Sequence, residues 1–449
     1  MLKETNNTIV ALSTPLGSGA ICVVRMSGED AIKIADKLFA NNNGKKPSEF
    51  VSRMMELGEF KADGFCEQIL CVVFRAPNSF TGENLVEFQC HGGIRIADGI
   101  IKSCISHGAT MATAGEFSKR AFINGKMSLE KAEGMMDMIN AESEAEIRAG
   151  YDLLKGKVGK ETIWAQNKLV DLLSEVEVSF DYPEEDIEYV TKEKVQKVAS
   201  EIIAKLNTLI ETSEVGKQIK DGISLLILGE PNVGKSSLLN ALTQTSRAIV
   251  TDIAGTTRDT IEETLLIDGV KFKIIDTAGI HKTEDVVENL GIERAKDLIN
   301  SADLCLCLVD CSKKRNEKDE EVLALTNNVS RIVVGNKKDL AKEPKQVADI
   351  YISTADEKSI NELKKKIIKT TVKQNISSGV VITNARHLDA LKRAKKHLEK
   401  ALSSLKDGAS LDLVSIDLNL AYSALGEITG NTSGEDIISS IFAKFCLGK

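Results

Sequence analysis

Residues Gly229–Ser236 could hold the phosphates of a nucleotide, because they read G-x-x-x-x-G-K-S. In such a loop the glycines let backbone N–H groups face the phosphates, and the helix that follows adds the positive end of its dipole. Lys235 is expected to reach the β- and γ-phosphates, and the Ser236 hydroxyl to ligate Mg²⁺. A chance glycine-rich turn is the alternative, but a strand-like run at 223–228 and a helical run at 236–242 flank the loop as the motif requires.

A second segment, Asn336–Asp339, reads N-K-K-D and could choose the base. A carboxylate at Asp339 can accept hydrogen bonds from N1–H and the exocyclic amine of guanine. Adenine would leave that carboxylate unpaired, at a cost of roughly 1–3 kcal/mol, so the segment favours GTP over ATP. A solvated turn is the alternative for the tetrapeptide taken alone. Ser353 and Thr354, which follow the short run 349–352, are expected in the last loop that contacts the base.

Two segments between these motifs could respond to the γ-phosphate. Asp276–Gly279 (D-T-A-G) ends a strand-like run, where an acid can hold Mg²⁺ through a water molecule. Thr251–Asp259 is expected to form a switch loop in which Thr257 bonds Mg²⁺. Ras-like proteins place a glutamine after D-x-x-G to orient the attacking water, and Ile280 cannot do this. Hydrolysis therefore needs another group, for which the loop offers Glu284, Asp285 and Glu288.

The elements that must position these motifs change in kind along the chain. Residues 219–375 alternate strand-like and helical runs, which predicts a parallel sheet with crossover helices. Residues 1–124 mix both kinds, whereas 125–218 and 376–449 are almost wholly helical. The simplest interpretation is an N-terminal α/β domain, then a helical domain split in sequence by an inserted α/β domain. The runs expected are strands 8–12, 20–26, 68–74, 272–275 and 331–335, and helices 94–106, 129–149, 161–178, 192–212, 384–406 and 411–428.

Composition limits the class of protein. The 449 residues are 42% apolar and 28% charged, with a net charge of −8. This is enough apolar surface for packed cores, and no apolar run approaches the ~18 residues of a membrane helix. The acidic balance argues against a protein that coats nucleic acid non-specifically. Nine cysteines without a C-x-x-C pair predict a reducing compartment, a cytoplasmic location and no structural zinc.

Several of these segments together resemble one family. They are the phosphate loop, T-D-I-A-G-T-T-R-D at 251–259, and F-C-L-G-K at 445–449. Three N-terminal segments agree with them: P-N-S-F-T-G-E at 77–83, H-G-G at 91–93 and G-E-F-S-K-R-A-F at 115–122. Over essentially its whole length the chain resembles the tRNA wobble-uridine modification GTPases of the MnmE (TrmE) family.

The resemblance implies a Ras-like P-loop G domain as the inserted domain, and an N-terminal domain that binds 5-formyltetrahydrofolate and forms a homodimer. It also implies a partner subunit of the MnmG type, which carries FAD and completes a heterotetramer. Together they would add an aminomethyl or carboxymethylaminomethyl group to C5 of the wobble uridine of tRNA. No membrane partner is expected. GTP hydrolysis would need K⁺, whose charge near the β- and γ-phosphates can replace that of an arginine finger.

The same resemblance implies roles for individual residues. Lys235, Thr257 and Glu288 would act in hydrolysis, with Glu288 orienting the water. Mg²⁺ would be held by Ser236 and Thr257, and K⁺ by Asn232, Thr251, Ile253 and Thr256. Folate would contact Arg25, Glu87, Lys126 and Lys449. The full set expected around GTP is Asn232, Val233, Gly234, Lys235, Ser236, Ser237, Thr251, Asp252, Ile253, Ala254, Gly255, Thr256, Thr257, Asp276, Thr277, Ala278, Gly279, Asn336, Lys337, Asp339, Ser353 and Thr354.

Simpler interpretations remain for several of these residues. Arg25, inside an apolar strand, could be a salt-bridged rim residue, and Glu87 the exposed member of an alternating strand. Such groups nevertheless suit a folate, since a cation can pair with its glutamate tail and a carboxylate with the N–H donors of its pterin. His91 reads as a structural turn residue, and Cys446 could be a nucleophile or a packed side chain.

Two other functions remain open. A GTP-driven assembly or signalling switch, for example in ribosome maturation, would share the G domain without any modification chemistry. A folate-dependent one-carbon transferase that works without a flavoprotein is the other. The basic runs at 364–366 and 392–396 read as solvated helix faces, with a tRNA contact as the alternative.

Overall fold

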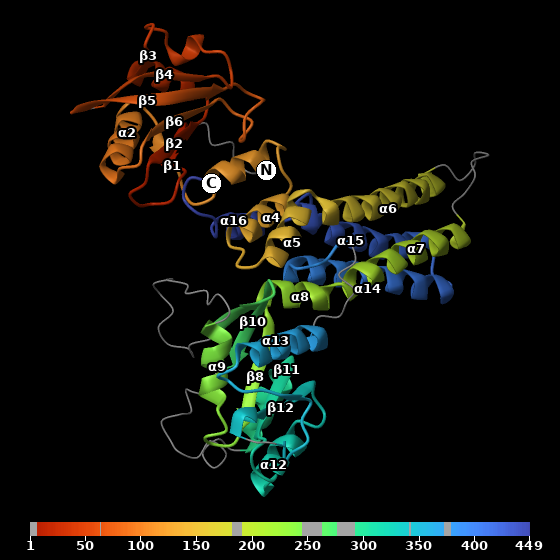
Figure 1. The fold of residues 1–449 in the computed structure, drawn as a ribbon. Coiled ribbons are helices and arrows are strands. Elements are labelled where there is room, and N and C mark those ends of the chain that lie inside the picture. Colours follow the sequence, from red (N-terminus) through yellow and green to blue (C-terminus); the bar gives the residue numbers. More distant parts are fainter. Residues whose placement is uncertain are drawn as a thin grey trace. The chain divides into compact units, whose positions relative to one another are not determined.

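The structure is a computed structural model that describes residues 7–62, 64–181, 191–244, 263–275, 292–340, 343–371 and 379–449 (Figure 1). The chain forms two compact units. The first comprises Met1–Met136, Asp152–Ile203 and Arg393–Lys449, and the second comprises Asp137–Tyr151 and Ala204–Lys392. The first unit contains the N-terminal sheet and most of the long helices. The second unit contains a second sheet, whose strands lie between residues 223 and 351. Division of the chain into domains at residues 124, 218 and 375 stays a prediction.

The N-terminal sheet has seven strands in the order β3-β4-β5-β6-β2-β1-β7. Neighbouring strands are antiparallel, except that β1 and β7 run parallel. The strands are β1 (Ile9–Leu12), β2 (Ile21–Ser27), β3 (Phe39–Asn41), β4 (Met55–Ala62), β5 (Phe65–Phe74), β6 (Leu85–His91) and β7 (Thr110–Met111). The strands expected near 8–12, 20–26 and 68–74 are therefore present.

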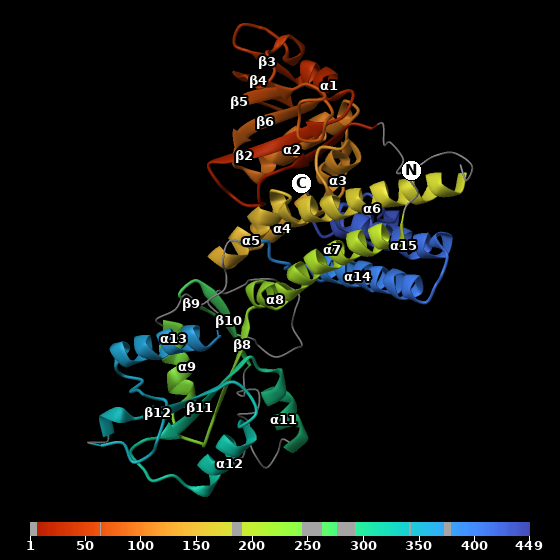
Figure 2. The ribbon, with the colours of Figure 1, turned by 90° about the vertical axis from the view of Figure 1, so that its right-hand side faces the viewer.

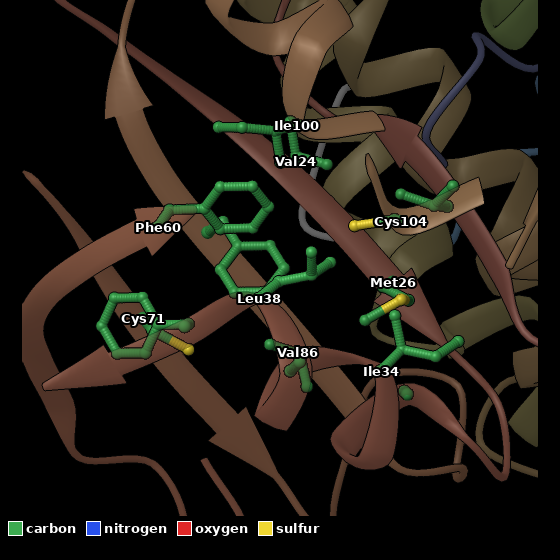
Figure 3. Close-up of a cluster of buried hydrophobic side chains, with 14 of the residues drawn as sticks. Val24, Met26, Ile34, Leu38, Phe60, Cys71, Val86, Ile100 and Cys104 are labelled. Atoms are coloured by element: carbon green, nitrogen blue, oxygen red, sulfur yellow. The ribbon is translucent and has the colours of Figure 1, made fainter. Parts of the chain in front are cut away.

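One face of this sheet is covered by α1 (Ala31–Leu38) and α2 (Ile94–Ser106) (Figure 2). Figure 3 shows the core between them, where Val24, Leu38, Phe60, Ile100 and other fully or nearly fully buried side chains meet. Side chains alternate between the two faces of a strand. The residues next to the buried ones, such as Arg25 and Glu87, therefore project from the opposite face.

A buried ion network fixes α3 (Glu116–Ile123) to the sheet. Arg120, only 4% exposed, lies 3.2 Å from Glu83 and 2.8 Å from Glu116. Ser27 of β2 donates a hydrogen bond to the other oxygen of Glu83. The buried charge of Arg120 is tolerated because it is paired and hydrogen-bonded. The network joins two of the segments noted in the sequence, 77–83 and 115–122.

The single helix expected over 129–149 is wrong, because the structure has two helices there, α4 (Leu129–Ile139) and α5 (Glu144–Leu154). The cause is an N-cap at Ser143, which begins a second helix. The backbone N–H of Glu146 donates to the Ser143 hydroxyl, and the Glu146 carboxylate accepts from the Glu142 N–H. The other helices are α6 (Lys157–Asp181), α7 (Lys192–Glu211), α8 (Ser213–Asp221), α14 (Ala385–Lys406), α15 (Leu411–Thr429) and α16 (Glu435–Phe442).

The second sheet has six strands in the order β13-β12-β11-β8-β10-β9. All neighbours are parallel except β9, which pairs antiparallel with β10 through a turn at Asp268-Gly269, both left-handed. The alternation in 219–375 did not predict this antiparallel edge. The strands are β8 (Ile223–Gly229), β9 (Glu263–Ile267), β10 (Val270–Ile275), β11 (Leu304–Asp310), β12 (Arg331–Asn336) and β13 (Ile350–Tyr351).

Helices lie on both faces of this sheet (Figure 1). One face packs against α9 (Lys235–Gln244) and α13 (Glu357–Thr371), and the other against α11 (Ile292–Ser301) and α12 (Glu317–Leu325). Because both faces are covered, β11 is buried along its whole length, which includes Cys305 and Cys307. In such a sheet, ligands bind beyond the carboxyl ends of the parallel strands.

An ion pair ties β10 to the connection between α4 and α5. The Lys271 ammonium lies 2.5 Å from a carboxylate oxygen of Glu142 and 3.7 Å from one of Glu146. All three side chains are at least three-quarters buried. Within the described ranges, no helix is long and apolar enough to cross a membrane.

Candidate functional site

The phosphate loop joins β8 to α9, as the sequence predicts. Asn232 has φ of 65° and Gly234 has φ of 103°, so the loop takes two left-handed turns before the helix begins. This conformation aims successive backbone N–H groups into one concavity, which is suited to an anion. The Lys235 ammonium lies over the loop and donates to the carbonyl oxygens of Gly229 and Glu230, at 2.7 and 2.8 Å. Burial lowers the pKa of Lys235, although the charge of Glu230 opposes this.

The base-selecting segment meets the phosphate loop through one side chain. Asn336 ends β12, is 1% exposed, and donates from its amide nitrogen to the Val233 carbonyl oxygen at 2.8 Å. A Cβ on Gly234 would lie 2.3 Å from that nitrogen, so only glycine permits the approach. The Asn336 amide oxygen is buried and has no hydrogen-bond partner within the described part of the chain. A buried acceptor of this kind can be satisfied by a donor group on a bound ligand.

The rest of the segment is held by an acid that the sequence analysis missed. The Lys337 ammonium lies 2.9 Å from Asp310, the last residue of β11 and the register partner of Asn336. Burial opposes ionisation of Asp310, but hydrogen bonds from Ser312 and Lys337 hold its pKa below the usual value. The signal was available in the sequence, since Asp310 ends a strictly apolar strand. Asp339 lies in a 3₁₀ turn, Lys338–Leu340, with its side chain exposed.

The loop that begins at Ser353, expected to contact the base, lies beside the segment Asn336–Asp339. The Lys338 N–H donates to the Ile352 carbonyl at 3.0 Å, which places Ser353 and Thr354 next to the N-K-K-D residues. Ser353 is buried, its N–H donates to the Ser359 hydroxyl, and its own hydroxyl accepts from the Ala355 N–H. Ser236 and Ser237 at the start of α9 are exposed.

Several expected residues lie outside the described ranges. They are Thr251, Asp252, Ile253, Ala254, Gly255, Thr256, Thr257, Asp276, Thr277, Ala278, Gly279, Ile280, Glu284, Asp285 and Glu288.

A second candidate site lies on the face of the N-terminal sheet that α1 and α2 leave open, called the open face here. Beside β1 this face is covered, because Ala11 packs against the buried Phe117 of α3. Strand register places Val72, Glu87, Arg25 and Ala11 in one row across four strands. The Arg25 guanidinium is 2.8 Å from the Glu87 carboxylate, and the two side chains are 21% and 16% exposed. The salt bridge foreseen for Arg25 therefore exists, and its partner is the other residue expected to contact folate. Both groups keep free hydrogen-bonding capacity on this face.

Lys126 lies at one end of this face. Its aliphatic stem packs on Gly82, whose Cβ would come within 3.0 Å of the Lys126 side chain. It lines a cavity together with Phe80, and the Arg25 guanidinium is 5.4 Å from the centre of the Phe80 ring. Phe80 therefore lies next to Arg25 and also lines the cavity that Lys126 lines.

The C-terminal tail reaches the sheet at the end of β1. The Ser13 hydroxyl, just past β1, donates to the Gly448 carbonyl at 3.1 Å, and a Cβ on Gly448 would lie 2.1 Å from the Leu12 carbonyl oxygen. This brings Lys449 to the sheet across more than 430 residues of sequence. Cys446 is exposed, and its backbone carbonyl accepts from Gly115. His91 is exposed and lies 2.6 Å from Glu67, as the structural interpretation expects.

Comparison with known proteins finds matches over nearly the whole length of the chain. A family model described as the MnmE helical domain matches residues 129–446, and one described as the GTP-binding protein TrmE N-terminus matches residues 8–126. The chain belongs to the MnmE family. A tRNA modification GTPase MnmE of Lactobacillus helveticus is 40% identical over 99% of this chain and 98% of its own. The corresponding proteins of Lactobacillus gasseri and Geobacillus thermodenitrificans are 41% and 39% identical, again over 99% of this chain and 98% and 99% of theirs. Together the two family models cover residues 8–126 and 129–446, which include the phosphate loop, Arg25 and Glu87.

Proposed function

We propose that this member of the MnmE family hydrolyses GTP to GDP and phosphate and uses the reaction in tRNA modification. Its relatives over the full length are named tRNA modification GTPases. The observation that carries the proposal for this chain is the bond between Asn336 and Val233, which fixes the base-selecting segment at 2.8 Å from the phosphate loop. One ligand with both a base and phosphates can then satisfy both segments at once.

The roles of the G-domain residues follow from this arrangement. Phosphate oxygens are stronger acceptors than the two loop carbonyls that Lys235 now binds, so Lys235 turns to the β- and γ-phosphates. Ser236, at the first turn of α9, holds Mg²⁺, which neutralises charge on those phosphates. Asp339 accepts from guanine, while the Asp310–Lys337 pair keeps the segment in place.

We further propose that Thr257 completes the Mg²⁺ site and that Glu288 orients the attacking water. K⁺ would be held by Asn232 with Thr251, Ile253 and Thr256. Asn232 supports the K⁺ site, because it takes a left-handed conformation at the tip of the phosphate loop and is exposed there. A cation at that tip would supply charge where hydrolysis develops it.

The open face of the N-terminal sheet is proposed to bind 5-formyltetrahydrofolate as one-carbon donor. Glu87 would accept from the pterin N–H groups, and the cations Arg25, Lys126 and Lys449 surround the same face. Homodimerisation through this domain, and action with an FAD-carrying subunit of the MnmG type on the wobble uridine, complete the proposal. A cytoplasmic location fits nine free cysteines.

Two measurements test these proposals separately. We expect GTP hydrolysis to be at least tenfold faster in K⁺ than in Na⁺, and Asn232→Ala to remove most of the difference; equal rates in the two salts would refute the K⁺ site. Titration with 5-formyltetrahydrofolate should show saturable binding that is lost in Glu87→Gln. Absence of binding by the unmodified chain would favour a GTP-driven switch without modification chemistry.

A further inference from the structure

The cavity that Lys126 lines has a volume of about 350 Å³, and all the charged side chains that line it are cations. Two cations, Arg53 and Lys126, lie on its wall with Phe74, Phe80, Asn78 and Ser79, and no acidic side chain lines it. Neither cation forms an ion pair with an acid within the described part of the chain. A cavity with two cations, an amide and a hydroxyl is suited to an anion that carries more than one carboxylate.

The wall of this cavity is held in place by hydrogen bonds. The Arg53 guanidinium donates to the Asn78 carbonyl at 3.1 Å, and the Ser79 hydroxyl donates to the Glu83 carbonyl at 2.5 Å. On the other side, the Asn124 amide donates to the Thr81 carbonyl at 2.7 Å. Loop 77–83 is therefore fixed from both ends, and a ligand would meet a site that needs little rearrangement.

Arg53 has a backbone conformation that arginine rarely adopts. Its φ is 68°, in the left-handed region, and its N–H donates to the Val73 carbonyl at 2.8 Å. A side chain other than glycine in this region is strained, and strain of this kind is concentrated at sites that bind ligands. In this conformation the Arg53 side chain lines the cavity.

The cavity continues the open face that carries Arg25 and Glu87. Phe74 lies two residues after Val72 on β5, so it projects from the same face as Glu87. Phe80 lines the cavity, and the centre of its ring is 5.4 Å from the Arg25 guanidinium carbon. One ligand can therefore reach from Glu87 past Phe80 to Arg53.

We propose that this cavity binds the glutamate end of the folate and that Arg53 is a specificity residue for folates with several γ-linked glutamates. This inference rests on the proposed folate function of the face. The first glutamate already carries two carboxylates, and each added γ-linked glutamate contributes one more. Lys126 would pair with a carboxylate of the first glutamate, and Arg53 with one of an added glutamate in a bidentate manner. Glu87 would then hold the pterin end of the same molecule.

The test compares the Kd of 5-formyltetrahydrofolate with one glutamate and with three, measured calorimetrically on the full chain. We expect the triglutamate to bind about tenfold more tightly. Arg53→Asn should make the two affinities equal, and Arg53→Lys should keep part of the difference. Asparagine tolerates a left-handed backbone, so the first variant keeps the fold. Lys61→Gln, an exposed cation of β4 that does not line the cavity, is the matched control and should change neither Kd.

The outcomes separate the inference from the function on which it rests. Equal affinities for the two folates in the unmodified chain, or a difference that persists in Arg53→Asn, overturn the role of Arg53 while folate binding itself stands. Binding of neither folate contradicts the proposed function and the inference together. A variant Arg53→Asn that loses affinity for tRNA but not for triglutamate would assign the cavity to an RNA phosphate and overturn the proposal.

Discussion

Replacing Gly448 by alanine tests whether the docked tail is part of the folate site. Gly448 has φ of 87°, which costs a residue with a Cβ roughly 1–2 kcal/mol. The new methyl carbon would lie 2.1 Å from the Leu12 carbonyl oxygen, a backbone atom that cannot move away cheaply. We expect the tail to leave the end of β1 and to lose its hydrogen bond from Ser13, about 1 kcal/mol.

The measurable consequence is weaker folate binding. Lys449 leaves the open face with the tail, and loss of a hydrogen bond between a cation and a carboxylate costs about 1.5–3 kcal/mol. That corresponds to a Kd for 5-formyltetrahydrofolate about 10- to 150-fold higher, read by calorimetric titration. Basal GTP hydrolysis should not change, because the phosphate loop belongs to the other unit.

Gly44→Ala is the matched control. Gly44 has φ of 78°, so alanine suffers the same backbone strain there, but a Cβ at this position meets nothing within 4 Å. It should lower stability slightly and leave folate binding intact. The reasoning is refuted if Gly448→Ala binds folate as the unmodified chain does, or if Gly44→Ala loses as much affinity.

Three further predictions concern single positions. Burial raises the pKa of Glu130 to about 7, so the folded protein keeps a proton between about pH 4.5 and 7 that the unfolded chain has lost. Stability should therefore fall by about 3 kcal/mol as pH rises through this window, and denaturation midpoints of Glu130→Gln should lack that fall. Asp339→Asn should lower GTP affinity at least tenfold and admit xanthosine triphosphate, whose base has a carbonyl in place of the amine; competition binding that still favours GTP would contradict the placement of Asp339. Gly234→Ala should abolish nucleotide binding, because its Cβ would lie 2.3 Å from the Asn336 amide, whereas Gly269→Ala, with a similar left-handed φ but open surroundings, should retain it in a filter-binding assay.

The phosphate loop could be predicted from the sequence because its geometry is local. A strand, a loop with Gly234 and a helix follow one another within about 20 residues, so the motif and its context are read together. The N-K-K-D segment was predicted for the same reason. The ion pair between Asp310 and Lys337 that supports this segment could not be predicted. It joins residues 27 positions apart, which meet through the register of two parallel strands.

The N-terminal site depended on contacts that no local pattern contains. Arg25 and Glu87 are 62 residues apart and meet only because β2 and β6 are neighbours in the sheet. The approach of Gly448 to Leu12 spans almost the whole chain. The break after α4 could have been read from the sequence, because Ser143 and Glu146 have the S-x-x-E spacing of a capping box, but the apolar periodicity on either side concealed it.

The ion pairs of Lys271 with Glu142 and Glu146 couple any movement of β10 to the segment between α4 and α5. Lys271 lies four residues before the end of β10, about 13 Å along a strand, and the next residue in the chain is Asp276 of the D-T-A-G segment. A strand hydrogen-bonded to a neighbour on each side resists stretching. A displacement of the carboxyl end of β10 along the strand is therefore transmitted to the Lys271 ammonium. Since separating a buried cation from its acids is costly, the segment between α4 and α5 is drawn along with the strand instead of being left behind.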